Sequence, residues 1–132
     1  MTQRNIDVMD MIVTKMEEGE KFSKALKAVY TKRNVVIPYC EEMNNVVITS
    51  LPMSNRTINV VMRGKLQTIG EVIDYCNQKK ITSIPNLGKT AGIELFETIL
   101  DYCWEHMNKN EKTQFFIDTV ERNSENIRDE VA

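Results

Sequence analysis

The sequence predicts an all-α fold. Over most of the chain, apolar residues recur every three or four positions, which is the spacing of one buried helix face. Serine, threonine or glycine stands at the expected ends of several of these segments, where helices are capped. Two short β-branched runs, 35–37 and 46–48, break the pattern. They could form short strands, but we favour extended connectors packed on the core.

Two amphipathic helices are expected in the first third of the chain. The first covers residues 4–18 and ends at Gly19; its expected buried face consists of Ile6, Met9, Ile12 or Val13, and Met16. The second covers residues 21–32 and is expected to bury Phe22, Ala25, Leu26 and Val29. The apolar faces of these two helices need more surface to pack against than a small middle domain offers. We therefore interpret residues 1–45 as a helical extension with a structural role or as the contact surface of a homodimer.

Four helices and one single turn are expected in the rest of the chain. Ser54 is a suitable N-cap for a helix through Arg63 that Gly64 ends, and Thr68 can cap the next helix. A single turn at residues 81–84 leads to a long helix, 89–107, with a buried side made of Ile93, Phe96, Ile99 or Leu100, Cys103 and Met107. The last helix covers residues 111–122 and is expected to bury Phe115, Ile117 and Val120. We expect the polar tail, 123–132, to fray.

The composition is typical of a soluble globular protein. The chain has 132 residues, enough for one domain with a helical extension. No apolar run approaches the roughly 20 residues that span a bilayer, so we expect no membrane partner. The three cysteines are far apart in the sequence, and an odd number cannot all pair. We interpret them as reduced thiols of a cytoplasmic protein.

The net charge of −2 hides an uneven distribution along the chain. Residues 46–92 carry six basic side chains against two acidic ones, whereas residues 93–132 carry four basic against ten acidic ones. A basic segment can attract phosphate even in a mildly acidic protein. The middle of the chain is therefore where a nucleic-acid contact is expected.

Two segments in this basic part place a glycine in a tight turn at the start of a helix. They are residues 66–70 and residues 84–89, and the second contains Leu87-Gly88-Lys89. A short helix, a glycine hairpin and a second helix form a helix-hairpin-helix element. The unpaired N–H groups at the second helix's start can bind a phosphate oxygen. Gly88 permits close approach of the backbone, and Lys89 adds a positive charge there.

Three short motifs in this segment resemble, in the same order, the C-terminal domain of the bacterial RNA polymerase alpha subunit. They are Arg56-Thr57-Ile58-Asn59, Thr68-Ile69-Gly70-Glu71 and Pro85-Asn86-Leu87-Gly88-Lys89. The resemblance covers roughly half of the chain and implies a compact helical bundle, 46–122, with two helix-hairpin-helix elements. It also implies binding of A·T-rich double-stranded DNA upstream of promoters, through the minor groove.

The resemblance assigns roles to six residues. It implies that Arg56 enters the minor groove, supported by Asn59, and that Asn86 and Gly88 meet the phosphates together with Lys89. It also implies that Glu94 helps to hold the arginine. A narrow A·T-rich groove concentrates negative potential and attracts arginine, which agrees with this assignment. After the matching lysine, the family usually has a second lysine and a serine, where this chain has Thr90 and Ala91. Thr90 can still donate to phosphate, but one positive charge is missing.

The functional hypothesis is a non-enzymatic DNA-binding protein of transcription that needs no cofactor. The alternative is a protein-interaction module that uses the same fold to bind RNA polymerase, a sigma factor or a regulator. Thr90, Ala91 and the acidic last third of the chain motivate this alternative. No nucleophile stands beside a candidate base, and the cysteines and His106, the one histidine, lack the spacing of metal ligands.

Overall fold

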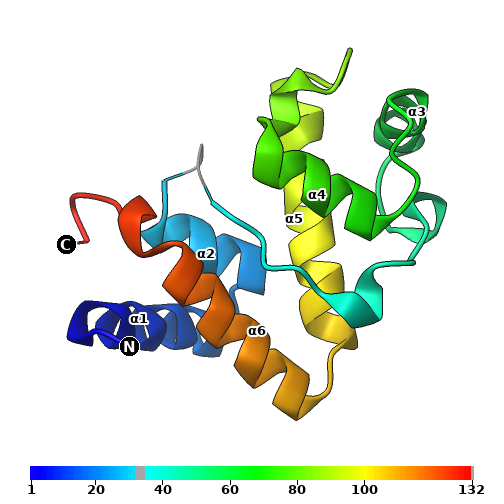
Figure 1. Ribbon diagram of the computed structural model, residues 1–132. Coiled ribbons are helices and arrows are strands. Elements are labelled where there is room, and N and C mark those ends of the chain that lie inside the picture. Colours follow the sequence, from blue (N-terminus) through cyan, green and yellow to red (C-terminus); the bar gives the residue numbers. More distant parts are fainter. Residues whose placement is uncertain (32–34, 132) are drawn as a thin grey trace. The chain divides into compact units, whose positions relative to one another are not determined.

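The chain forms six α-helices in the part that the structure describes. The structure is a computed structural model, and it describes residues 1–31 and 35–131. The helices are α1 (Gln3–Glu17), α2 (Phe22–Val29), α3 (Asn55–Arg63), α4 (Ile69–Gln78), α5 (Gly88–His106) and α6 (Lys109–Arg122) (Figure 1). Four short 3-10 helices accompany them, namely η1 (Glu41–Met43), η2 (Ile48–Ser50), η3 (Ile81–Ser83) and η4 (Ser124–Asn126). Because these residues include no strand, the all-α prediction is confirmed.

The two β-branched runs do not form paired strands. Residues 35–37 form neither a helix nor a strand, and Ile48 begins η2. In the described residues, β-pairing is limited to two isolated bridges, Tyr30 with Ile127 and Val47 with Thr68. The preference for connectors over strands is therefore confirmed, although Ile48 at the end of the second run belongs to a 3-10 helix and is not extended.

The chain divides into two compact units. Unit 1 consists of residues 1–38 and 106–132, and unit 2 of residues 39–105. We expected the last helix to belong with the middle of the chain, but α6 is part of unit 1. The reason is aromatic packing, because the ring of Phe22 on α2 lies 6.1 Å from the rings of both Phe115 and Phe116 on α6.

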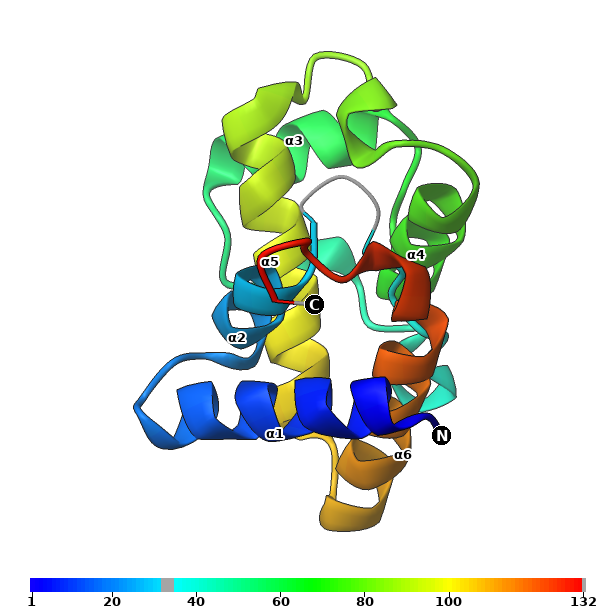
Figure 2. The same ribbon diagram turned by 90° about the vertical axis from the view of Figure 1, so that its left-hand side faces the viewer.

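Unit 1 is a bundle in which α1 packs against α2 and α6 (Figures 1 and 2). Its α1 is turned from the expected orientation, because Asn5, Val8 and Ile12 are its buried residues. Ile6 and Val13 were expected inside or at the edge of the core, yet they are 41% and 40% exposed. The expected face of α2 is buried as predicted, but that helix ends at Val29. Its predicted last residue, Lys32, lies outside the described residues.

The tail of the chain is not frayed as expected. After α6, the chain forms η4 and then places the side chain of Ile127 in the core, 6% exposed. Two backbone hydrogen bonds attach it to α2 and the following residues: Thr31 N–H donates to Asn126, and Arg128 N–H donates to Val29, both at 2.9 Å. The polar composition did not reveal this packing, because one apolar side chain, backbone pairing and polar side-chain contacts hold the segment.

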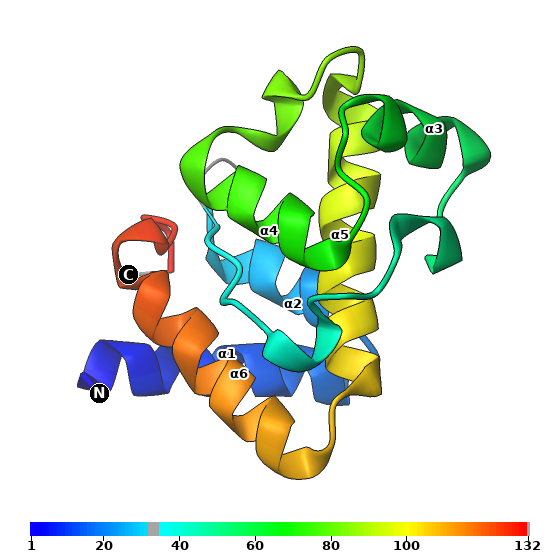
Figure 3. The same ribbon diagram turned by 45° about the vertical axis from the view of Figure 1, so that its right-hand side comes forward.

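Unit 2 is built around α5, with α3 beside the N-terminal half of that helix (Figures 1 and 3). The expected helix ends are confirmed, because Ser54 caps α3, Gly64 follows its last residue and Thr68 caps α4. The α5 core residues are Leu95, Ile99, Leu100 and Cys103; Ile93 and Phe96, which we expected to be buried, are partly exposed. The predicted face is therefore confirmed from Ile99 to Met107, whereas in the first turns of α5 the buried residues are Gly92 and Leu95.

Candidate nucleic-acid interface

The N-terminal half of α3 presents Arg56 and Asn59 to solvent. The Ser54 hydroxyl caps this helix by accepting the N–H of Thr57 at 3.3 Å. Thr57, Val60 and Val61 form the buried side of the helix. Arg56 and Asn59 are three positions apart, so they are neighbours on one helix surface, and both are exposed. The local sequence thus fixes which side of α3 carries the two predicted groove contacts.

The turn before α5 is anchored by two apolar side chains. Ile84 and Leu87 are buried, at 1% and 4% exposed, and Leu87 N–H donates to the carbonyl of Ile84 at 3.1 Å. With these residues fixed inside, the turn presents Asn86, Gly88 and Lys89 to solvent. The next residue, Thr90, is also exposed.

Two residues of this turn have a left-handed backbone. Asn86 has φ of 64° and Gly88 has φ of 74°. A Cβ at Gly88 would meet no atom within 4 Å, so steric room does not explain the glycine. Its positive φ does, because side chains other than those of glycine and asparagine are strained there. No neighbouring atom covers the backbone of Gly88 where a Cβ would lie, so the start of α5 is accessible to a ligand there.

Glu94 joins the starts of α3 and α5. Its carboxylate accepts the Ser54 hydroxyl at 2.9 Å and the Ser54 backbone N–H at 3.4 Å. A hydrogen bond with the Thr57 side chain is the largest influence that lowers the pKa of Glu94; the Ser54 hydrogen bonds add to it, and desolvation opposes them. These bonds tie the start of α3, just before Arg56, to the second turn of α5, five positions after Lys89.

The N-terminal ends of helices α3, α4, α5 and α6 differ in charge. The first turns of α4 and α6 contain Glu71 and Glu111, whereas those of α3 and α5 contain no acidic residue. At the N-terminal end of α3, the Glu94 carboxylate already provides a negative charge, because it accepts hydrogen bonds from Ser54. The start of α5 carries Lys89 instead. Of the two, the start of α5 is the better place for an external anion.

The first of the two predicted hairpins does not offer a phosphate site. The Glu71 carboxylate accepts Gln67 N–H at 3.2 Å, and the Thr68 hydroxyl accepts Glu71 N–H at 3.2 Å. Gly70 is buried, and a Cβ there would overlap the side chain of Asn44. This glycine therefore permits internal packing, and the helix start is closed by its own carboxylate. The expectation of an anion site at both hairpins is wrong for this one.

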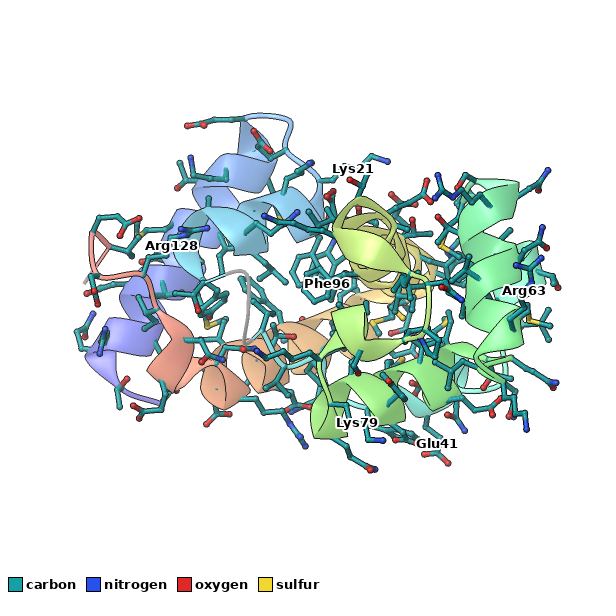
Figure 4. The ribbon with its side chains drawn as sticks, turned by 90° about the horizontal axis from the view of Figure 1, so that it is seen from above. Lys21, Glu41, Arg63, Lys79, Phe96 and Arg128 are labelled. Carbon is teal, nitrogen blue, oxygen red and sulfur yellow. The ribbon has the colours of Figure 1, made fainter. Side chains whose placement is uncertain are left out.

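Two basic side chains of unit 2, those of Arg63 and Lys79, lie apart (Figure 4). Arg63 ends α3, while Lys79 follows α4, and the two lie at separate edges of unit 2 (Figure 4). The ammonium of Lys79 lies 5.8 Å from the ring centre of Tyr75, in a cation–π contact. The net positive charge of this segment therefore does not by itself define the candidate interface. The candidate interface consists of the start of α3 and the turn before α5.

The sequence did not identify Ser54 and Thr57 as partners of Glu94. Forty positions separate Ser54 from Glu94, so no local pattern reveals their contact. The N-cap signal at Ser54 was visible, and the resemblance indicated that Glu94 acts near Arg56. The structure shows Glu94 bound to the residues that flank Arg56 in the chain.

The chain is similar to a DNA-directed RNA polymerase subunit alpha from Gracilaria tenuistipitata var. liui. The two are 29% identical over 76 residues, which is 58% of this chain and 24% of the relative. The chain therefore spans about a quarter of the length of that protein. No family model and no solved structure matches the chain. The similarity supports a distant relationship with the alpha subunit.

Neither a membrane span nor a metal cluster is found in the part of the chain that the structure describes. None of its helices combines the length and the apolar character needed to cross a bilayer. The same residues contain no group of three or more His, Cys, Asp or Glu side chains arranged to hold a metal ion.

Proposed function

We propose that the chain is a non-enzymatic DNA-binding protein of transcription that contacts A·T-rich double-stranded DNA through unit 2. Arg56, with Asn59 beside it, enters the minor groove. The turn before α5 binds the flanking phosphates through Asn86, the backbone at Gly88, and Lys89. The observation that supports the proposal is the Glu94 bridge, because it ties the start of α3, just before Arg56, to the second turn of α5.

The chemistry of the two segments suits them to different contacts with DNA. The arginine is suited to a narrow groove, where the negative potential of A·T-rich DNA is concentrated. The start of α5 combines a helix end without acidic residues, a left-handed glycine and a lysine, which suits a sequence-neutral phosphate contact. Thr90 is exposed and can donate a further hydrogen bond to phosphate. The likeness to an RNA polymerase alpha subunit supports a role in transcription.

The proposal is tested by fluorescence anisotropy with A·T-rich and G·C-rich duplexes at two salt concentrations. We expect the wild-type chain to prefer the A·T-rich duplex and to lose affinity as salt rises. Arg56→Ala should weaken binding and remove the A·T preference. Lys89→Ala should weaken binding to both duplexes and reduce the salt slope by about one unit.

The matched control is Arg63→Ala, which removes the same charge from the last turn of α3. We expect it to change affinity much less than Arg56→Ala and to leave the A·T preference in place. Circular dichroism would verify that all three variants are folded. Equal losses for Arg56→Ala and Arg63→Ala would contradict a specific groove contact. Absence of binding to either duplex at low salt would reject the DNA proposal.

A second candidate is a protein-interaction module that binds RNA polymerase, a sigma factor or a regulator through the same segments. It is favoured by Thr90 and Ala91, which replace a charged and a hydroxyl side chain of the family pattern. Purified polymerase, added to the labelled chain in the same anisotropy experiment, distinguishes the two. This candidate would be favoured if the wild-type chain binds polymerase but neither duplex, and if Arg56→Ala abolishes the polymerase binding.

A homodimer through the N-terminal helices is a further part of the proposal. Ile6 and Val13, seven positions apart on one side of α1, are 41% and 40% exposed, which leaves apolar surface for a second copy. Light scattering after gel filtration should show a mass that rises with concentration, and Val13→Glu should lower it. A strict monomer at high concentration would exclude the dimer.

A further inference from the structure

A cluster of side chains joins the end of α4 to η3. The Ser83 hydroxyl donates its hydrogen to the Lys80 carbonyl at 2.6 Å, so the Tyr75 hydroxyl is the donor in its 2.7 Å hydrogen bond with Ser83. The ring of Tyr75 also contacts the ammonium of Lys79, which lies 5.8 Å from the ring centre. These contacts restrict the conformation of the segment that carries Lys79 and Lys80.

Lys79 and Lys80 are both exposed, and they directly precede η3. Two backbone hydrogen bonds continue from there toward the turn before α5: Ser83 N–H donates to the Lys80 carbonyl at 2.9 Å, and Ile84 N–H donates to the Ile81 carbonyl at 3.2 Å. Helix α3, η3 and the start of α5 lie at the same end of unit 2 (Figures 1 and 3). Along the chain, the two lysines are therefore separated from the turn before α5 only by η3.

The chain around these lysines carries no negative charge. Residues 75–93 contain three lysines and no aspartate or glutamate. The carboxylates that border this stretch are those of Asp74 and Glu94, and the Glu94 carboxylate already accepts hydrogen bonds from Ser54. A stretch with charges of one sign, which includes both η3 and the turn before α5, favours a polyanion as the partner of both.

We propose that Lys79 and Lys80 contact phosphates of the DNA backbone beyond those bound at Gly88 and Lys89, so that the interface extends across η3 to the end of α4. This inference rests on the proposed function and adds a further part to its surface. Lysine binds phosphate as a point charge, so the contact adds affinity and salt dependence without changing the A·T preference. Because Tyr75 already limits the motion of Lys79, less side-chain entropy is lost when this ammonium meets a phosphate.

The test is fluorescence anisotropy of the full chain with A·T-rich and G·C-rich duplexes over a range of salt concentrations. We expect the double variant Lys79→Ala with Lys80→Ala to bind both duplexes more weakly. Its slope of log binding constant against log salt should be smaller by about two units. It should keep the A·T preference, which Arg56→Ala removes. Lys79→Arg with Lys80→Arg keeps both charges and should retain the wild-type slope.

The matched control is Arg63→Ala with Lys65→Ala. This double variant removes the same two charges from exposed positions at the end of α3 and just after it, so it changes the net charge equally. We expect a smaller change in its salt slope. Hydroxyl-radical footprinting on the A·T-rich duplex adds a second readout. Substitution of Lys79 and Lys80 should remove protection at one end of the footprint, and the control should keep it.

The outcomes separate this inference from the proposed function. If the wild-type chain binds DNA but the two double variants lose equal slope, or if the footprint keeps its length, the inference is overturned and the proposed function stands. If the wild-type chain binds neither duplex at low salt, both are rejected. Lysine at the end of a helix can also stabilise the helix itself, so circular dichroism must show that each variant is folded. If the lysine double variant is unfolded, Lys80→Ala decides, because it leaves the contact of Lys79 with Tyr75 and should still reduce the slope by about one unit.

Discussion

Ser54 and Glu94 form a contact that is both a helix cap and a link between helices. The Ser54 hydroxyl accepts the Thr57 N–H at 3.3 Å and donates to the Glu94 carboxylate at 2.9 Å. The Ser54 N–H donates to the other carboxylate oxygen. The start of α3 is thus stabilised both by its own N-cap and by hydrogen bonds to Glu94 of α5. Arg56 follows Ser54 by two residues, so we expect this contact to influence its orientation.

The first prediction concerns the pH dependence of this contact. The hydrogen bonds from Thr57 and Ser54 lower the pKa of Glu94 in the folded state. The stabilisation by its carboxylate is therefore complete above the unfolded pKa of about 4.3, and it is lost as pH falls through the folded pKa. We expect Glu94→Gln to lower the Tm at pH 6, with a difference from wild type that shrinks below pH 4.

Thermal unfolding of both chains across this pH range provides the measurement. Glu105→Gln makes the same change in charge at an exposed position of α5. It should give a smaller difference at pH 6. A gap between wild type and Glu94→Gln that stays constant down to pH 2.5 would show that the carboxylate charge does not stabilise the link.

The second prediction concerns the turn before α5. Gly88 has φ of 74°, and an alanine in this conformation is strained by about 1 to 2 kcal/mol. Gly88→Ala should therefore lower the free energy of unfolding by about that amount. Gly88→Asn should be closer to wild type, because asparagine tolerates the left-handed region. Urea unfolding measures both variants, and equal losses would mean that backbone strain is not the cause.

The third prediction concerns the packing of Gly70 on Asn44. A Cβ at residue 70 would overlap the Asn44 side chain and would also lie close to the Asn44 carbonyl oxygen. We expect Gly70→Ala to reduce stability by about 1 to 3 kcal/mol, as overpacked cores do. In the double variant with Asn44→Ala, part of this loss should disappear, because only the side-chain overlap is relieved. A double-mutant cycle measures the coupling, and strict additivity would refute the overlap.

These cases show what the sequence could and could not predict. Helix starts were predicted well, because Ser54 and Thr68 act on their own helices through contacts within three residues. The sequence also indicated Gly88, since a glycine beside a proline turn is a local signal. The role of Gly70 was misjudged, because its partner Asn44 lies on a distant connector. A glycine needed for internal packing and one that faces a ligand give the same sequence signal.

Helix faces were less predictable than helix ends. In α1, the apolar residues almost encircle the helix, so that Ile6, Val8 and Ile12 could each define a face. The buried Asn5 decides between them, because its amide donates to the Ser124 hydroxyl at 2.9 Å. That partner lies in the tail, which composition alone had suggested would fray. Long-range polar pairs of this kind leave no periodic signal.

The last prediction concerns Asn123, which fastens the end of α6 to the connector after α2. Its side-chain amide donates to the carbonyls of Val36 and Thr119 at 2.9 and 2.8 Å, and its oxygen accepts the Val36 N–H at 2.8 Å. Asn123 is fully buried. Alanine there would leave the N–H and carbonyl of Val36 without this partner. We expect Asn123→Ala to lower the free energy of unfolding by about 2 to 4 kcal/mol, since each unpaired buried group costs about 1 to 3 kcal/mol.

Asn108→Ala supplies a comparison at the other end of the same helix. Asn108 is the exposed N-cap of α6 and accepts the Glu111 N–H at 2.8 Å. Its loss should reduce stability by about 1 kcal/mol, because water can replace a surface cap. Urea unfolding monitored by circular dichroism measures both variants. If the two losses are equal, Asn123 acts only as an ordinary helix end, and the connector at Val36 is held by other contacts.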